Sequence, residues 1–327
     1  MSRLQLALIG CGQIGLVHAR RLVKDGRAEF RILCDPSPHG AETIRRECFP
    51  NANYVSTVAE ALAAPGLDGV IIATPTHLHY EQALAALHAG IPTLCEKPLA
   101  ETRDKIVHLI AEAAKPNAPL FVVGYQRRFW SPYLTLKREI ASGRWGKVLA
   151  FSLHNSEHWL QLQALPGTWR NDPAQNPGGY LGDAGSHKID ALFYLTGLEP
   201  TEVFAYSDNC GANVPITSMI TGMLTGNVPL ALSFVGNAHH FREDLHIVLE
   251  HADLVMADEK LWIARKNELT PLTDLEPDSD ATLGFLDILQ GKLPNFAPAG
   301  CALPVFDFTM AALESARNGR IQKIAHA

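Results

Sequence analysis

Apolar strand segments alternate with helical segments over residues 4–124, and this alternation restricts the possible fold more than any other feature. The apolar runs are nearly continuous, which is typical of strands in a sheet that helices cover on both faces. The runs lie at residues 4–10, 30–35, 68–75, 91–97 and 118–124, with helical stretches at 13–25, 40–48, 78–89 and 102–114. We therefore expect a doubly wound parallel α/β sheet.

A different pattern begins after an expected helix at 132–142. Strand segments now follow one another, with Gly, Asn or Pro turns between several of them, at residues 147–159, 201–208, 217–225, 228–238, 244–257 and 260–264. This pattern favours a second, mostly antiparallel sheet. One helix at 182–196 interrupts these strands, and an amphipathic helix that Gly319 closes ends the chain.

The length of 327 residues suits two domains better than one. We place a dinucleotide-binding domain at 1–124 and a substrate-binding and oligomerisation domain at 125–327, with the C-terminal helix packing back on the first domain.

Composition excludes several classes of partner. The net charge of −6, with scattered Lys and Arg residues, argues against nucleic acid. No signal peptide and no apolar span long enough for a membrane is evident, so we expect a cytoplasmic protein without a membrane partner. The six cysteines lie far apart without a Cys-x-x-Cys pair, and we interpret them as buried thiols.

A glycine-rich loop follows the first strand at "LIGCGQIG". Gly10, Gly12 and Gly15 have the G-x-G-x-x-G spacing, and Gln13 and Ile14 complete the loop. In a strand–loop–helix context these glycines permit a tight turn, close approach of a pyrophosphate and close helix–strand packing. We predict a dinucleotide site at these residues.

Asp35 ends the second strand, where a carboxylate accepts hydrogen bonds from an adenosine ribose and repels a 2′-phosphate. No Arg follows it directly, so the sequence favours NAD over NADP. The carboxyl ends of the next strands carry Thr74, Pro75 and His79, and then Glu96 and Lys97. We expect these residues to line the cofactor too.

Three stretches together resemble the glucose–fructose oxidoreductase, inositol dehydrogenase and MocA family: "GCGQIG", "TPTHLHYEQALAALHAGIPTLCEKPLA" and "GGYLGDAGSHKIDALFYLTG". The resemblance covers essentially the whole chain. It implies an N-terminal Rossmann domain, a C-terminal α/β domain with a large open sheet, and a nicotinamide cofactor between them. It also implies a cis peptide before Pro98 and a homo-oligomer, dimer or tetramer, packed sheet to sheet.

The same resemblance assigns catalysis to Lys97, Asp183 and His187. Asp183, His187 and Asp190 have i, i+4 and i+7 spacing, which predicts one face of the helix at 182–196. His187 is the expected base and Lys97 the donor to the reacting oxygen, although the sequence leaves open which of them transfers the proton. Relatives often have three glycines where this chain has Pro177, Gly178 and Gly179, so substrate fit is open there.

Arg127 and Trp169 are candidate contacts to a small hydroxylated substrate. Close histidine pairs occur, but further ligands at zinc-like spacing do not, so no metal is expected. The leading hypothesis is an NAD-dependent sugar, polyol or cyclitol dehydrogenase. The alternatives are a redox-cycling NAD-dependent hydrolase or lyase, and a non-catalytic nucleotide- and sugar-binding regulator.

Overall fold

The computed structural model describes residues 3–325 and divides the chain into two compact units. The first unit comprises Met1–Tyr125 and Ser279–Ala302, and the second comprises Gln126–Asp278 and Leu303–Ala327. The chain therefore leaves the first unit near the expected boundary, but it returns there for one later segment. No feature of the sequence indicated this return.

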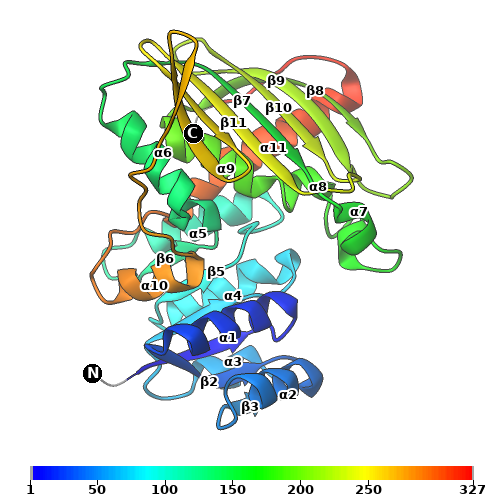
Figure 1. Cartoon of the computed structure of the whole chain (residues 1–327). Helices are drawn as coiled ribbons and strands as arrows, with labels where there is room; N and C mark the ends of the chain where they lie inside the picture. Colours follow the sequence, from blue (N-terminus) through cyan, green and yellow to red (C-terminus); the bar gives the residue numbers. More distant parts are fainter. Residues whose placement is uncertain (1–2, 326–327) are drawn as a thin grey trace. The chain divides into compact units, whose positions relative to one another are not determined.

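A six-stranded parallel sheet forms the centre of the first unit, in the order β3-β2-β1-β4-β5-β6 (Figure 1). The strands are β1 (Leu4–Ile9), β2 (Ala28–Cys34), β3 (Asn53–Val55), β4 (Gly69–Ile72), β5 (Thr93–Cys95) and β6 (Phe121–Val123). The order reverses at β1, so the ends of β1 and β4 flank the topological switch point at which such sheets bind ligands. The expected doubly wound sheet is confirmed.

Helices join these strands as right-handed crossovers require. They are α1 (Gln13–Asp25), α2 (Pro38–Glu47), α3 (Val58–Leu62), α4 (Thr76–His88) and α5 (Arg103–Ala113). Ser37 and Thr102 cap α2 and α5 with their hydroxyl groups, and Thr57 and Glu60 form a capping box at α3. The strands bury almost every side chain, which explains their continuous apolar runs.

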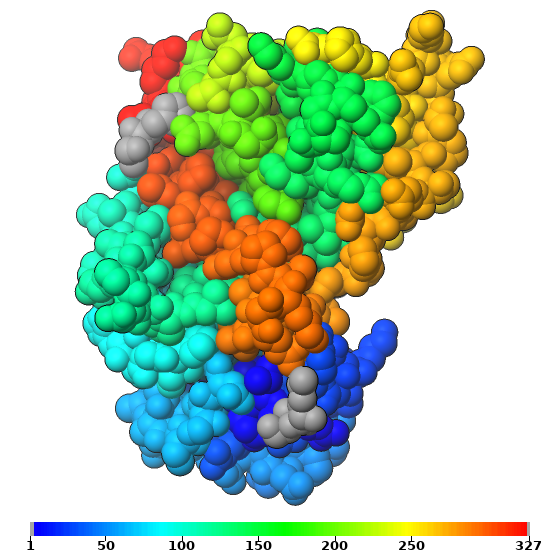
Figure 2. All heavy atoms as spheres, turned by 90° about the vertical axis from the view of Figure 1, so that its left-hand side faces the viewer, coloured from blue at the N-terminus to red at the C-terminus, as the bar shows by residue number. Residues whose placement is uncertain are grey.

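The returning segment carries α10 (Ala281–Leu289), which packs beside α1. Figure 2 shows its orange atoms against the blue atoms near the start of the chain. Arg27 lies 2.5 Å from Asp287, and Phe285 is fully buried close to Gly69 of β4. A buried aromatic side chain and an ion pair thus hold α10 in the first unit.

A nine-stranded sheet dominates the second unit, in the order β14-β13-β12-β11-β7-β10-β9-β8-β15. Its strands are β7 (Val148–Ser156), β8 (Pro200–Asp208), β9 (Thr217–Leu224), β10 (Val228–Val235), β11 (Arg242–Leu249), β12 (Asp253–Ala257), β13 (Lys260–Arg265), β14 (Glu268–Pro271) and β15 (Gln322–Lys323). All pairs are antiparallel except β7 with β10. The mostly antiparallel sheet is confirmed.

One face of this sheet is covered by helices, including α9 (Ser186–Thr196) and α11 (Ala302–Asn318) (Figure 1). We expected the C-terminal helix to pack on the first domain, but α11 belongs to the second unit from Leu303 onward. Phe308 packs edge-on against Phe193 of α9, and Ser315 accepts a hydrogen bond from the backbone of Ala205 in β8. The apolar face of α11 is therefore used within the second unit.

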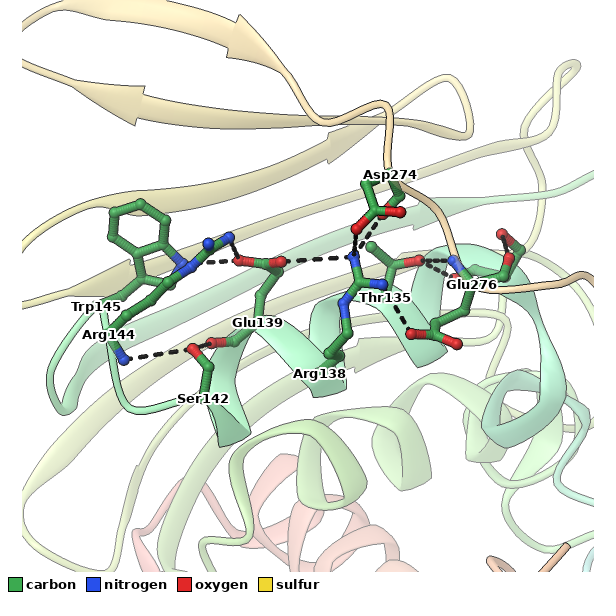
Figure 3. Close-up of polar contacts among 9 residues, drawn as sticks. Thr135, Arg138, Glu139, Ser142, Arg144, Trp145, Asp274 and Glu276 are labelled. Atoms are coloured by element: carbon green, nitrogen blue, oxygen red, sulfur yellow. Dashed lines mark hydrogen bonds and ion pairs between the residues drawn. The ribbon is translucent and has the colours of Figure 1, made fainter.

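Helix α6 (Ser131–Ala141) holds the extended segment that follows β14 (Figure 3). Arg138 lies 3.2 Å from the carboxylate of Asp274 and 2.8 Å from that of Glu276. The backbone N–H of Glu276 also donates to Thr135. The last residues of the segment before it leaves the second unit are thus fixed to one helix.

Buried charges connect strand β11 with α6, α9 and the short helix η1 (Gln126–Phe129). Arg127 donates to both carboxylate oxygens of Glu243, at 3.4 and 2.6 Å, and Tyr133 donates to the same carboxylate. Lys188 lies 3.8 Å from Glu243 and donates to Glu157 at 2.6 Å. Burial opposes the charge on Glu243, yet Arg127 and Lys188 lower its pKa to about 2.

We predict that Glu243→Gln makes the second unit less stable at neutral pH and less sensitive to acid. The carboxyl pKa falls from 4.5 to about 2 on folding. The ionised Glu243 therefore stabilises the folded state fully above pH 4.5, and this contribution is lost as the pH falls through about 2. It amounts to about 3 kcal/mol in the free energy of unfolding. Urea unfolding at pH 7 and pH 3 should show a difference between variant and wild type that shrinks with acid.

The exposed Glu314, paired with Arg317, provides the control, because Glu314→Gln should change stability little at either pH. A constant difference between Glu243→Gln and wild type at both pH values would contradict the assignment.

Candidate active site

The glycine-rich loop between β1 and α1 has the geometry that a dinucleotide needs. Gly10 has a φ of +94°, and an added Cβ there would lie 2.7 Å from the backbone of Ala73. At Gly15 a Cβ would lie 2.2 Å from the carbonyl oxygen of Gly10. By contrast, a Cβ added at Gly12 would have no described atom within 4 Å. Gly10 and Gly15 thus permit tight packing, whereas Gly12 faces open space.

Asp35, directly after β2, holds this loop. Its carboxylate accepts hydrogen bonds from the backbone N–H of Cys11 at 2.9 Å and of Ser37 at 3.0 Å. Each carboxylate oxygen retains a further lone pair for a ribose hydroxyl. At the start of α1, Gly12 brings no side-chain cap for the first-turn N–H groups. These residues fit the pyrophosphate and ribose of a dinucleotide.

The loop between β4 and α4 contains three predicted cofactor residues, and the structure separates them. Thr74 and Pro75 precede α4 and are half-buried, and Thr74 donates to Gln82. His79 instead lies inside the unit, with its side chain 1% exposed. Its two ring nitrogens lie 2.7 Å from the carbonyl oxygen of Thr74 and 2.8 Å from that of Pro98. The expectation that His79 lines the cofactor is therefore corrected.

Glu96 and Lys97 follow β5 and are half-buried, and the peptide bond between Lys97 and Pro98 is cis, as the resemblance implied. The Glu96 carboxylate lies close to Gly124, where an added Cβ would come within 2.9 Å of it. A larger side chain at position 124 would displace this carboxylate.

His18 of α1 contacts the same carboxylate, a role that the sequence prediction missed. Its Nε2 lies 3.2 Å from Glu96, and its Nδ1 lies 2.8 Å from the hydroxyl of Thr282 in α10. Burial opposes the charge of Glu96, but His18 and Lys97 lower the pKa of its carboxyl group. A histidine amid the apolar positions of α1 was the available signal, but its partners come from distant parts of the sequence.

In the second unit, Asp183 and His187 lie on either side of a break between two helices. The expected helix at 182–196 is in fact α8 (Gly179–Gly182) followed by α9, and Asp183 occupies the break with φ −86° and ψ −87°. The i, i+4 spacing therefore does not describe one continuous helix. Both side chains are buried, and Arg170 holds Asp183 through a hydrogen bond of 2.8 Å.

Asp190 does not join the two other predicted residues in a common role. It pairs with Arg128, whose Nε lies 2.9 Å from one carboxylate oxygen and whose NH2 group lies 2.7 Å from the other. The pair is buried, so Asp190 stabilises the packing of α9 against η1.

The two predicted substrate contacts, Arg127 and Trp169, also have partners within the second unit. Arg127 is 3% exposed and bound to Glu243, so we no longer place it against a substrate. Trp169, half-buried in η2 (Trp169–Asn171), stacks under the guanidinium of Arg170 at 4.4 Å. Trp169 therefore helps to orient the arginine that holds Asp183.

Three observations concern the other expectations. Within residues 3–325, no group of three or more His, Cys, Asp or Glu side chains has a geometry that would hold a metal ion. No helix in that range is long and apolar enough to cross a membrane. The cysteines are free thiols, but Cys48, Cys210 and Cys301 are only partly buried, which corrects the expectation of fully buried thiols.

Comparisons with known proteins agree with this geometry. The family described as "Oxidoreductase family, NAD-binding Rossmann fold" matches residues 4–125, and the GFO/IDH/MocA C-terminal domain matches residues 133–257. An inositol 2-dehydrogenase of Acidothermus cellulolyticus is 31% identical over 80% of this chain and 75% of its own length. That of Streptomyces avermitilis is 33% identical over 65% of this chain and 59% of its own length.

The chain belongs to the GFO/IDH/MocA oxidoreductase family. It is an NAD-dependent oxidoreductase, so the predicted family, fold class and cofactor are confirmed. Solved structures share its fold. The WlbA dehydrogenase from Bordetella pertussis, in complex with NADH and UDP-GlcNAcA, has a TM-score of 0.85 at 20% identity, and each chain is covered completely. The aldose–aldose oxidoreductase from Caulobacter crescentus has a TM-score of 0.86 at 21% identity over 99% of this chain and 100% of its own.

We predict that two glycine substitutions in the NAD loop act differently. Gly12→Val should fold normally, because no described atom lies within 4 Å of a Cβ at this position and its φ of −78° suits any residue. The valine side chain should fill the space for the pyrophosphate and raise the Kd for NADH at least about tenfold. Gly15→Ala should lower the melting temperature through its clash with Gly10. Thermal melts and NADH fluorescence titrations measure both effects.

Normal NADH binding by Gly12→Val would show that the cofactor does not approach this part of the loop. Equal melting temperatures of Gly15→Ala and wild type would contradict the packing role of Gly15.

Proposed function

We propose that this protein is a dehydrogenase that oxidises a secondary hydroxyl group of a neutral cyclitol, polyol or sugar with NAD⁺. The proposal is carried by one observation: a dinucleotide loop open at Gly12 occurs in the same chain as Lys97 and the buried pair Asp183 and His187. The identity with inositol 2-dehydrogenases supports the substrate class.

In the proposed reaction the hydroxyl oxygen loses its proton while hydride leaves the carbon that bears this hydroxyl group. Bound NAD⁺ supplies the hydride acceptor. His187 accepts the hydroxyl proton, and Asp183, itself held by Arg170, orients the imidazole and stabilises its charged form. Lys97 donates a hydrogen bond to the reacting oxygen. The proposal requires Lys97 and His187 to act on one hydroxyl group.

The pairing of the arginines favours a neutral substrate. An acidic or phosphorylated sugar needs a cation that is available to its anionic group. Arg127 is paired with Glu243 and Arg170 with Asp183, so both guanidinium groups already have a carboxylate partner. We therefore infer hydroxyl groups rather than carboxylates or phosphates as the recognised groups.

We predict that NADH forms when the protein meets NAD⁺ and a panel of cyclitols, polyols and neutral sugars, with uronic acids and sugar phosphates as poorer substrates. Lys97→Ala and His187→Ala should each lower kcat at least about a hundredfold and leave NADH binding nearly intact, because acid–base groups contribute about that much. NADH absorbance measures turnover, and fluorescence measures binding.

Lys115→Ala, which removes an exposed lysine paired with Glu112, is the matched control and should retain full turnover. If both residues serve one step, the double variant Lys97→Ala/His187→Ala should have about the same kcat as the less active of the two single variants. Cleavage of a glycoside without net NADH would replace the dehydrogenase with the redox-cycling hydrolase. Full activity in either single variant would refute its role.

We also propose a homo-oligomer that forms through the uncovered face of the nine-stranded sheet. This face has a hollow of about 730 Å³ whose lining includes Phe204, Tyr206 and Met219. These three side chains are 43%, 63% and 45% exposed, so they form an apolar patch. A second copy of this chain, with the same patch, would bury it by two-fold symmetry.

Tyr206→Glu should therefore shift the protein toward the monomer, which light scattering coupled to size-exclusion chromatography measures. Val107→Glu places the same charge on an exposed apolar position of α5 and should leave the mass unchanged. A wild-type monomer, or an unchanged oligomer in Tyr206→Glu, would contradict this interface.

The expected cytoplasmic location forms part of the same proposal, because NAD⁺ is available to an enzyme there. Fractionation of cells that produce the protein tests it, and recovery outside the cytoplasmic fraction would contradict it.

A further inference from the structure

His79 is a buried titratable side chain next to the segment that carries Lys97. It lies one turn into α4 with 1% of its surface exposed. Its Nε2 contacts the carbonyl oxygen of Thr74 at 2.7 Å, and its Nδ1 contacts that of Pro98 at 2.8 Å. One imidazole ring thus bridges the loop after β4 and the loop after β5.

Both partners of this ring are carbonyl oxygens, which only accept hydrogen bonds. A neutral imidazole donates one bond, and a protonated imidazole donates two. Burial lowers the pKa of His79, while the two carbonyl groups and the Glu96 carboxylate favour the charged ring. In either state His79 donates a hydrogen bond to at least one main-chain carbonyl group. Loss of the ring would leave this partly buried carbonyl group without that donor.

A second histidine contacts the same segment one residue before Lys97. His18 lies 3.2 Å from the Glu96 carboxylate and contacts Thr282 with its other ring nitrogen. The backbone N–H of Lys97 lies 3.3 Å from Glu96 as well. Lys97 therefore sits between a carboxylate that His18 contacts and a carbonyl group that His79 contacts.

We propose that His79 is a positioning residue that fixes Lys97 through the main chain of Pro98. This inference rests on the proposed function for its kinetic consequence, because Lys97 is assigned there as the donor to the reacting oxygen. We assign His79 no direct contact with cofactor or substrate, because it is 1% exposed and both ring nitrogens contact main-chain carbonyl oxygens. Its contribution is to restrict the backbone directly after Lys97, so that the ammonium group is held in one place.

His79→Phe tests the proposal because it retains an aromatic ring but has no donor. It should lower kcat about 10- to 100-fold, since a small displacement of a catalytic group has an effect of that size. The KM for the alcohol and the Kd for NADH should change little. His79→Gln keeps a side-chain N–H donor in its amide group and should restore part of kcat. The exposed His88 on the same helix supplies the control His88→Phe, which should behave as wild type.

A spectroscopic readout separates this proposal from the proposed function. The amine of Lys97 can be labelled by reductive ¹³C-methylation, and Lys97→Arg assigns its NMR signal. The signal should shift in His79→Phe and stay in place in His88→Phe, whether or not an alcohol substrate has been found. Failure of the substrate panel with a shifted Lys97 signal would thus refute only the proposed function.

Three results would overturn the assignment. An unchanged Lys97 signal in folded His79→Phe would remove the link between the two residues. Weaker NADH binding with unchanged kcat would make His79 a cofactor contact. A lower melting temperature with unchanged kcat would make it a purely structural residue. If His79→Phe does not fold, the kinetics and Lys97 signal of His79→Gln decide, since wild-type values in both would overturn the proposal.

Discussion

The parallel direction of neighbouring strands is the constraint on which the cofactor site depends. Each crossover returns the chain to the same edge of the sheet, so the residues after β1, β2, β4 and β5 all emerge at the carboxyl ends of strands. Gly12, Asp35, Thr74 and Lys97 follow four different strands for this reason. Their grouping requires no specific side-chain interaction, only a sheet whose order reverses at β1 and β4.

Buried polar groups then define the details around Lys97. The segment after β5 leaves a glutamate and main-chain carbonyl groups in a region with little water, and two histidines supply partners for them. His18 comes from α1 and His79 from α4, so two different helices contribute. A single loop thus depends on contacts from elements far apart in sequence.

The second unit uses the same principle with full charges. Lys188, directly after His187, and Arg127 are both buried, and Glu243 and Glu157 provide their counter-charges. Removal of one partner leaves an uncompensated charge, which is far more destabilising than the pair is stabilising. Near Asp183 a half-buried arginine, stacked on Trp169, serves one carboxylate. Charged residues that could contact a substrate, judged from the sequence alone, therefore largely form ion pairs within the protein itself.

Local sequence was sufficient where local physics decides. Apolar periodicity predicted β1, β2, β4, β5 and β6 and the helices α1, α2, α4 and α5, but it missed the short elements β3 and α3. The glycine spacing predicted a dinucleotide loop, because turn geometry depends on near neighbours. The spacing of Asp183 and His187 misled the prediction, since it assumed a continuous helix. Residues near Gly185 end α8 and start α9 separately, and tertiary contacts such as that between Arg170 and Asp183 accompany this break.

By itself the sequence determined the family, the two sheets and the cofactor, because these follow from patterns within windows of tens of residues. Only the tertiary structure decided which charged residues remain available for chemistry. Arg127 meets Glu243 across 116 positions, and His18 meets Thr282 across 264. The energy of such contacts depends on distance and burial in the folded chain, and neither quantity is encoded in local spacing. For that reason the sequence suggested His79 as a cofactor contact, whereas in the fold its ring is buried against the main chain of Thr74 and Pro98.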